Sequence, residues 1–177
     1  MTDTPTPENP QTPAQPADTD AQQAQGPAIR VLGQYIKDLS FENPGNVQVS
    51  TQPNIDLGID VGATPHVSGD NLYEVSLKLK ANAQAEDKIL FITELDYAGL
   101  FKLDGVSEAD LEPMLLIECP RLLFPYARRI ISEITRDGGF PPLLIDPVDF
   151  VGLYRSQKAK AAQAAAPAPA PEAPQQA

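Results

Sequence analysis

Residues 119–154, CPRLLFPYARRIISEITRDGGFPPLLIDPVDFVGLY, decide how the second half of this 177-residue chain folds. The run is dense in apolar residues, but proline and glycine interrupt it, so it predicts helical pieces joined by bends. Gly138 supplies the stop of its main helix. Apolar side chains at helical spacing predict one buried stripe along that helix: Leu123, Ala127, Ile130 and Ile134. The run holds no recognisable catalytic motif, which favours a surface for packing and binding.

Two helical pieces are expected between residues 105 and 138. Asp110 can cap a short first helix, and Pro113 is tolerated in its first turn, where N–H groups lack intrahelical partners. Pro120 then predicts a break, because proline removes a backbone donor. The second helix should begin just before Pro125.

The sequence GGFPP at residues 138–142 predicts a linker after the second helix. Two adjacent glycines permit movement, and two prolines prevent regular structure. The pair Asp146 and Pro147 then favours the start of a third helical piece. Core packing explains each large apolar residue around the linker more simply. Together, however, they predict a groove for an extended peptide, lined by Phe124, Phe140, Leu143, Leu144, Phe150 and Tyr154.

The sequence before residue 105 has the period of strands. Residues 72–81, LYEVSLKLKA, alternate strictly between apolar and polar side chains and give the most regular predicted strand. Residues 87–101, DKILFITELDYAGLF, also alternate but carry apolar side chains on both faces, so a cover on both faces is expected. Because the chain has too little helix for two covers, we expect a second subunit to supply one.

Two further strands are expected upstream, in residues 30–44, RVLGQYIKDLSFENP, and in residues 46–61, NVQVSTQPNIDLGIDV. Pro53 cannot donate to a strand ladder, so the second of these should be an edge strand or break there. Four strands joined by loops of moderate length suggest an antiparallel sheet. The predicted fold class is therefore α+β, with a four-stranded antiparallel sheet followed by helices that pack on it.

Composition indicates one folded domain between two tails. Residues 1–27 are rich in Pro, Gln, Thr, Asp and Ala without any apolar period, which predicts a disordered tail. Residues 156–177 change from Ala, Lys and Gln to alternating Ala and Pro, which predicts a second disordered tail that begins as a frayed helix end. Residues 28–155 remain as the domain. The chain begins without a secretory signal, and no stretch approaches the roughly 20 apolar residues that cross a bilayer, so a cytoplasmic protein is expected.

The net charge of −11 is concentrated in the predicted sheet. Residues 28–112 contain 14 acidic and 6 basic side chains, whereas residues 113–155 contain five of each. Such a field repels nucleic acid and attracts a basic protein surface. A solvated acidic face that only aids solubility explains the charge about as well.

The chain offers no residues that combine into a reaction centre. Its one cysteine, Cys119, and one histidine, His66, exclude an intrachain disulfide and a Cys/His metal site. A buried structural role fits Cys119 better than a nucleophilic one, because apolar residues surround it. Adjacent acids such as Glu86 and Asp87 lack the interleaved ligands of a calcium loop. We therefore expect no enzyme, no cofactor and no metal.

The elements CP, LFPYAR, FP and PVDF of residues 119–150 closely resemble the segment that SecB export chaperones carry after their sheet. The likeness continues upstream through YIKDLSFENP, LYEVSLKLKA and LFITELDYAGLF in family order, and so covers nearly all of residues 30–154. It implies a four-stranded antiparallel sheet with helices behind it, in a homotetramer built as a dimer of dimers. It also implies a cytosolic holdase that binds unfolded precursor proteins and passes them to the translocase ATPase SecA.

The resemblance further implies two sets of contact residues on the sheet. In the family an acidic face contacts SecA, and the matching positions here are Asp38, Glu42, Ile92 and Glu94. Alternate positions on one strand support tetramer assembly and match Thr93, Leu95 and Tyr97. Relatives often carry a tryptophan where this chain has Thr51. Their C-terminal extension assists SecA contact, a role that is not expected for the Ala/Pro tail here.

Two other functions stay open at this stage. One is a SecB-like holdase dedicated to a single partner, such as the antitoxin of a toxin–antitoxin pair. The retained acidic set of Asp38, Glu42 and Glu94 favours export over that reading. The other is a ligand-binding or enzymatic domain, which would need a closed polar pocket with perturbed ionisable groups. The sequence offers no support for such a pocket.

Overall fold

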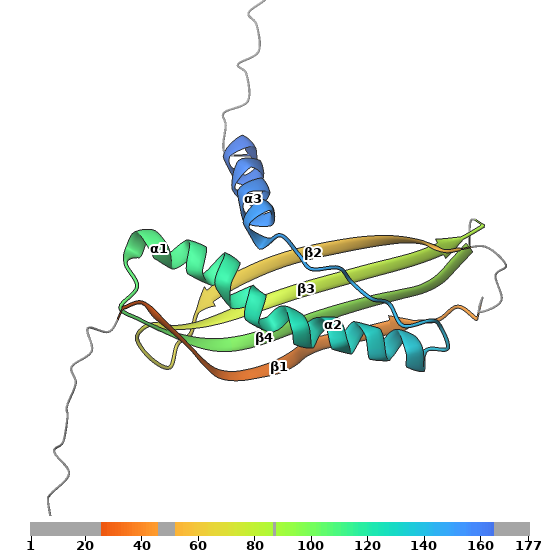
Figure 1. Ribbon diagram of the computed structural model, residues 1–177, viewed down its shortest axis with the longest axis horizontal. Helices are drawn as coiled ribbons and strands as arrows, with labels where there is room; N and C mark the ends of the chain where they lie inside the picture. The colour runs from red at the N-terminus through yellow and green to blue at the C-terminus, as the bar shows by residue number, and fades with distance from the viewer. Residues whose placement is uncertain (1–25, 46–51, 87, 165–177) are drawn as a thin grey trace, which may run out of the picture.

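The computed structural model describes residues 26–45, 52–86 and 88–164 of the chain. Its strands form one antiparallel sheet in the order β1-β4-β3-β2. The strands are β1 (Ala28–Glu42), β2 (Asn54–Pro65), β3 (Leu72–Ala85) and β4 (Lys88–Asp104). The helical segments follow the strands in sequence; those that come first run across one face of the sheet, whereas the last helix projects beyond β2 (Figure 1). The predicted fold class is confirmed.

The edge strand β2 shows the expected effect of proline. It begins at Asn54, directly after Pro53, and pairs with β3. A residue without an N–H group therefore stands just outside the ladder. The opposite edge strand, β1, pairs with β4 and carries register shifts between Val31 and Gly33 and between Ile36 and Asp38, which bend it locally.

The helical region begins with three segments that join end to end: α1 (Glu108–Pro113), the π-helical turn η1 (Met114–Glu118) and α2 (Cys119–Asp137). The predicted break at Pro120 and the predicted start before Pro125 are therefore wrong. In η1 the N–H of Cys119 bonds to the carbonyl of Met114, one residue further back than in an α-helix. This wider turn precedes Pro120 and lets the chain continue helically through a residue that has no donor.

Side-chain hydrogen bonds explain where the first and the last helix start. Ser107 rather than Asp110 caps α1, because the Ser107 hydroxyl accepts a hydrogen bond of 3.2 Å from the Asp110 amide. The last helix, α3 (Phe150–Ala164), begins later than the Asp146–Pro147 pair predicts. Its first turn is fixed by the Asp149 carboxylate, which accepts from the Gly152 amide at 3.0 Å.

α3 also extends beyond the predicted domain boundary at Arg155. Residues 156–164 are helical, where the sequence predicts that the second tail begins as a frayed helix end. Alanine, lysine and glutamine have high helix propensity, which explains the extension, and the alternating prolines come later. The other parts of the two predicted tails, residues 1–25 and 165–177, lie outside the described residues.

The core fills the space between α2 and the sheet. Every fourth residue of α2 is buried against it: Cys119, Leu123, Ala127, Ile131 and Thr135. The stripe thus contains Ile131 and Thr135 where Ile130 and Ile134 are expected. From the sheet, the main buried partners are Leu77, Leu79, Leu95 and Phe101. Within the described part of the chain, no helix is long and apolar enough to cross a membrane.

Cys119 is fully buried in this core, as the sequence predicts. Burial first, and the neighbouring Glu118 carboxylate second, raise the pKa of its thiol to about 12. The reactive thiolate is therefore scarce in the native protein at pH 8.5, where an unfolded cysteine is about half ionised. We expect iodoacetamide to label the denatured chain within minutes and the native chain at least tenfold more slowly, as measured by mass spectrometry. Equal labelling rates would contradict this burial.

Candidate functional site

The sheet face opposite α2, here called the open face, gathers all four residues that the resemblance assigns to the SecA contact. The register sets Asp38 opposite Asp96, and Glu42 opposite Ile92. Glu94 follows Ile92 by two residues, and side chains two apart on a strand share a face. Strands distant in sequence, β1 and β4, thus place the four side chains on one surface.

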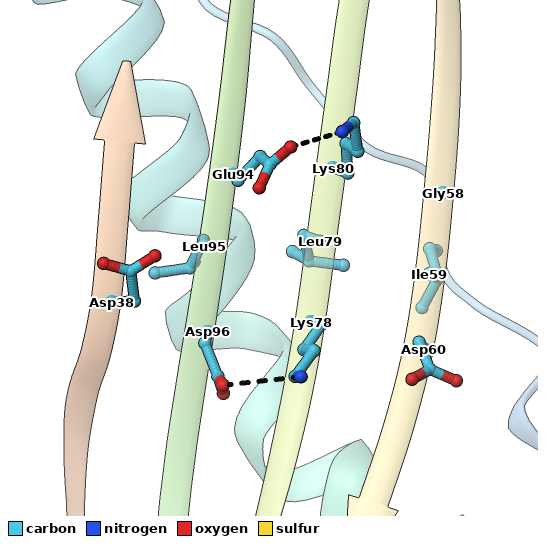
Figure 2. A pocket seen from close by; sticks show the side chains of 10 residues that line it. All are labelled: Asp38, Gly58, Ile59, Asp60, Lys78, Leu79, Lys80, Glu94, Leu95 and Asp96. Atoms are coloured by element: carbon cyan, nitrogen blue, oxygen red, sulfur yellow. Dashed lines mark ion pairs between the residues drawn. The ribbon is translucent and has the colours of Figure 1, made fainter.

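Two lysines of β3 lie beside these acids, and the sequence-based assignment did not include them. Lys80 forms an ion pair with Glu94, and the Lys78 Nζ lies 4.0 Å from an Asp96 carboxylate oxygen (Figure 2). The hydrogen bond to Glu94 raises the pKa of Lys80, so this lysine stays charged near neutral pH. Both lysines could have been found from the strict alternation of LYEVSLKLKA, which puts them on its polar face.

A shallow hollow of about 450 Å³ follows these pairs across all four strands, with Asp38 at one side and Asp60 at the other. Glu94 and Lys80 keep 46% and 63% of their side chains exposed. A surface of paired but hydrated charges is suited to an exchange of ionic partners, because exposed pairs hold together weakly.

The polar surface continues along the open face at Glu74 of β3. Its carboxylate accepts from the Lys37 Nζ at 2.6 Å and from the Tyr35 hydroxyl. Both hydrogen bonds lower the pKa of Glu74, and the one from Lys37 has the larger effect. The edge strand β1 is thereby tied to β3 across β4.

The three positions matched to tetramer assembly lie on the other face, under α2. Thr93 and Leu95 are buried within the chain itself, and the Thr93 hydroxyl donates to the Ser40 carbonyl at 2.9 Å. Tyr97 is 8% exposed and stacks on Tyr126 of α2, with ring centroids 6.4 Å apart. Any contribution of these side chains to assembly must pass through neighbours such as Tyr126, which is half exposed.

The six predicted groove residues separate into four places. Phe124 and Phe150 pack edge to face with centroids 6.0 Å apart and fill the core. Leu144 is largely exposed. Tyr154 lies on α3, where its hydroxyl accepts from the Lys158 Nζ at 2.9 Å.

Phe140 and Leu143 do line a groove together, of about 120 Å³, at the end of the sheet. We call it the FPPL groove, after its wall at residues 140–143. The sequence-based assignment did not include the other lining residues of the groove. They are Pro53, just before β2, Ile55 of β2, Leu90 and Phe91 of β4, and Pro141 and Pro142 of the wall itself. The Phe140 ring packs on Phe91 and on Phe41, with centroids 5.0 and 6.4 Å apart.

The GGFPP linker is closely packed where it meets the sheet. A Cβ on Gly138 would lie 2.3 Å from the Phe41 ring, so a side chain there would have to displace that ring. Gly139 has a φ of +90°, which favours glycine. The two glycines therefore form a tight turn that carries Phe140 into the aromatic cluster.

A family model described as Preprotein translocase subunit SecB matches residues 22–161, a range that spans the sheet, α1, η1, α2 and most of α3. The chain belongs to the SecB family. The Protein-export protein SecB of Hyphomonas neptunium is 68% identical over 163 residues, which cover 92% of this chain and 94% of that protein. The protein of the same name from Maricaulis maris is 55% identical over 154 residues, covering 85% and 87%.

Among solved structures, a SecB-like chaperone from Mycobacterium tuberculosis, in complex with a ChAD peptide from the HigA1 antitoxin, resembles this SecB-family chain with a TM-score of 0.59. The match covers 68% of this chain and 90% of that one at 14% identity, and it supports the fold alone. The sequence comparisons thus confirm the family that the LFPYAR-centred elements suggest. The structural comparison supports the sheet with its helices.

Proposed function

We propose that this SecB-family chain is a protein-export chaperone that holds unfolded precursor proteins in the cytoplasm and delivers them to the ATPase SecA. The observation that carries the proposal is the separation of two surfaces on one domain. The open face presents Asp38, Glu42 and Glu94, and the FPPL groove presents apolar side chains at the sheet end. An unfolded precursor and SecA can therefore bind at the same time. The mechanism involves no reaction, cofactor or nucleotide.

Client binding follows from the apolar lining of the FPPL groove. An extended apolar segment gains about 25 cal/mol for each Å² it buries, before the cost of ordering it. A groove of about 120 Å³ accepts a side chain or two, so one subunit holds a client weakly. A homotetramer, arranged as a dimer of dimers, would raise the effective concentration of grooves along one client and hold it by avidity. Folded proteins escape because their apolar segments are buried.

The surface around Tyr126 of α2, which stacks on Tyr97, is suited to contact between subunits. Leu122 and Tyr126 of α2 are 43% and 50% exposed, and Ile36, which pairs with Tyr97 across the sheet, is also exposed. Large apolar side chains grouped on a surface are typical of contacts between subunits. Thr93 and Leu95 would support this surface from beneath, by positioning α2.

SecA delivery follows from the charge of the open face. A basic surface on the partner would replace Lys80 as the counterion of Glu94, with little net change in hydration because both groups are already solvated. Binding of this kind weakens as salt screens the charges. The antitoxin-dedicated alternative has less support, because the relatives named for protein export are far closer in sequence than the antitoxin-bound neighbour.

The direct test mixes the protein with a chemically unfolded precursor, with SecA, and with both. We expect suppression of precursor aggregation and a ternary complex whose mass, measured by light scattering, exceeds that of either binary complex. A folded form of the same precursor serves as the control and should not bind. Holding without any SecA binding would refute the export role and leave the dedicated-holdase alternative.

A further inference from the structure

We propose that Thr135 is a positioning residue for the FPPL groove: its hydroxyl and its carbonyl together hold the Phe140–Leu143 wall in place. This inference rests on the proposed function, because it assigns the groove to client binding. Thr135 contacts no client itself. It lies near the end of α2, fully buried, on the helix face that meets the core.

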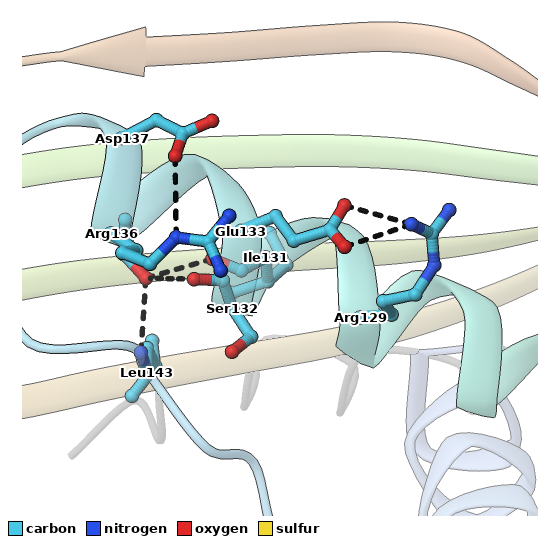
Figure 3. Close-up of polar contacts among 8 residues, drawn as sticks. Arg129, Ile131, Ser132, Glu133, Arg136, Asp137 and Leu143 are labelled. Carbon is cyan, nitrogen blue, oxygen red and sulfur yellow. Dashed lines mark hydrogen bonds and ion pairs between the residues drawn. The ribbon is translucent and has the colours of Figure 1, made fainter.

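The two hydrogen bonds from the wall both end on Thr135. The Phe140 amide donates to the Thr135 carbonyl at 3.1 Å. The Leu143 amide donates to the Thr135 Oγ1 at 2.9 Å, the dashed line that starts at Leu143 in Figure 3. Between them, Pro141 and Pro142 have no N–H to donate. Every backbone donor of the Phe140–Leu143 segment is therefore anchored on one residue.

The chemistry requires a hydroxyl at this position. The Thr135 Oγ1 donates its proton within α2, to the Ile131 carbonyl at 2.9 Å with the Ser132 carbonyl at 3.1 Å. Its lone pairs are then left for the Leu143 amide. Valine has the same shape but can neither donate nor accept, and serine keeps the hydroxyl while losing the buried methyl group. The pair of substitutions separates hydrogen bonding from packing.

The anchor acts on the residues that line the groove. Phe140 packs on Phe91 from β4, and Leu143 packs against the same small apolar cluster. If Leu143 loses its acceptor, its part-buried amide must open toward water, since an unpaired amide is costly to keep buried. The wall then leaves the position in which Phe140 and Leu143 face Ile55 and Leu90.

The test compares full-length wild type, Thr135→Val and Thr135→Ser. The probe is reduced, carboxamidomethylated α-lactalbumin, which cannot refold and is acidic, so that charge attraction to this acidic protein is not the source of binding. We expect Thr135→Val to weaken probe binding about three- to tenfold, the effect of one lost hydrogen bond, and to speed exchange of the Leu143 amide by a similar factor. Thr135→Ser should retain the slow exchange and most of the affinity.

The exchange of core β4 amides shows whether either variant loosens the whole fold. The inference is overturned if Thr135→Val leaves the Leu143 exchange unchanged, or if Thr135→Ser weakens probe binding as much as valine does. Failure of wild type to bind the probe would instead count against the proposed function. In that case the exchange of Leu143 would still report whether Thr135 anchors the wall.

Discussion

Glu94→Lys is expected to lower the affinity for SecA at least tenfold and to leave client holding unchanged. The substitution turns the most exposed ion pair of the open face, Lys80 with Glu94, into two like charges beside Lys78. A basic partner surface then meets repulsion where it met attraction, and like charges brought together at an interface cost several kcal/mol. The fold should tolerate the change, because exposed pairs contribute about 1 kcal/mol at most. Isothermal calorimetry with SecA at low and high salt measures the effect.

The matched control for this variant is Glu133→Lys. Glu133 is 42% exposed and pairs with Arg129, 63% exposed, so its environment copies that of Glu94 on the helical side of the domain. Both variants change the net charge equally, and both must keep the wild-type assembly mass. Loss of SecA binding in both would mean that total charge decides, and unchanged SecA affinity for Glu94→Lys would remove the open face from the proposal.

The sheet and the character of its two faces could be predicted, because the alternation along a strand shows directly which side chains share a face. Alternation along LYEVSLKLKA fixes which side chains of β3 are buried, and the acids of β4 follow at the same period. Because β4 carries apolar side chains on both faces, the sequence also predicts that both faces are covered. α2 covers one side, and a partner for the other side remains a proposal.

The helical half could not be predicted as well, because its exceptions depend on hydrogen bonds that composition does not reveal. Pro120 breaks an ordinary α-helix, yet η1 reroutes the bonding just before it. Phe124 and Phe150 resemble groove residues but pack on each other in the core. Thr135 has a detectable signal, since it continues the four-residue spacing from Cys119, but its bond to Leu143 depends on the turn at Gly139.

Leu123→Ala is expected to lower the free energy of unfolding by about 2–5 kcal/mol, the range for deleting a buried leucine side chain that leaves a cavity. Leu123 is fully buried where α2 crosses β4. Urea unfolding at one fixed protein concentration measures the loss, because assembly also contributes to stability. Leu144→Ala removes the same atoms from a side chain that is 68% exposed and should change stability by about 0.5 kcal/mol or less. Equal losses for the two variants would contradict this position of the core.

The contact that makes Leu123 sensitive can be tested from its other side. A Cβ on Gly99 of β4 would lie 2.8 Å from the Leu123 Cδ2 and 2.7 Å from the Phe101 Cε2, so Gly99→Ala should cost about 1–3 kcal/mol by overpacking. In the Leu123→Ala background, the methyl group added by Gly99→Ala can partly occupy the space that Leu123 leaves, so the destabilisation caused by Gly99→Ala should be smaller. The difference is the coupling energy of a double-mutant cycle. A coupling of zero would mean that other contacts set the spacing between α2 and the sheet. A favourable coupling would mean that the contact between Leu123 and Gly99 sets this spacing. The position of α2, and with it that of Thr135 and the FPPL groove, would then depend on this contact.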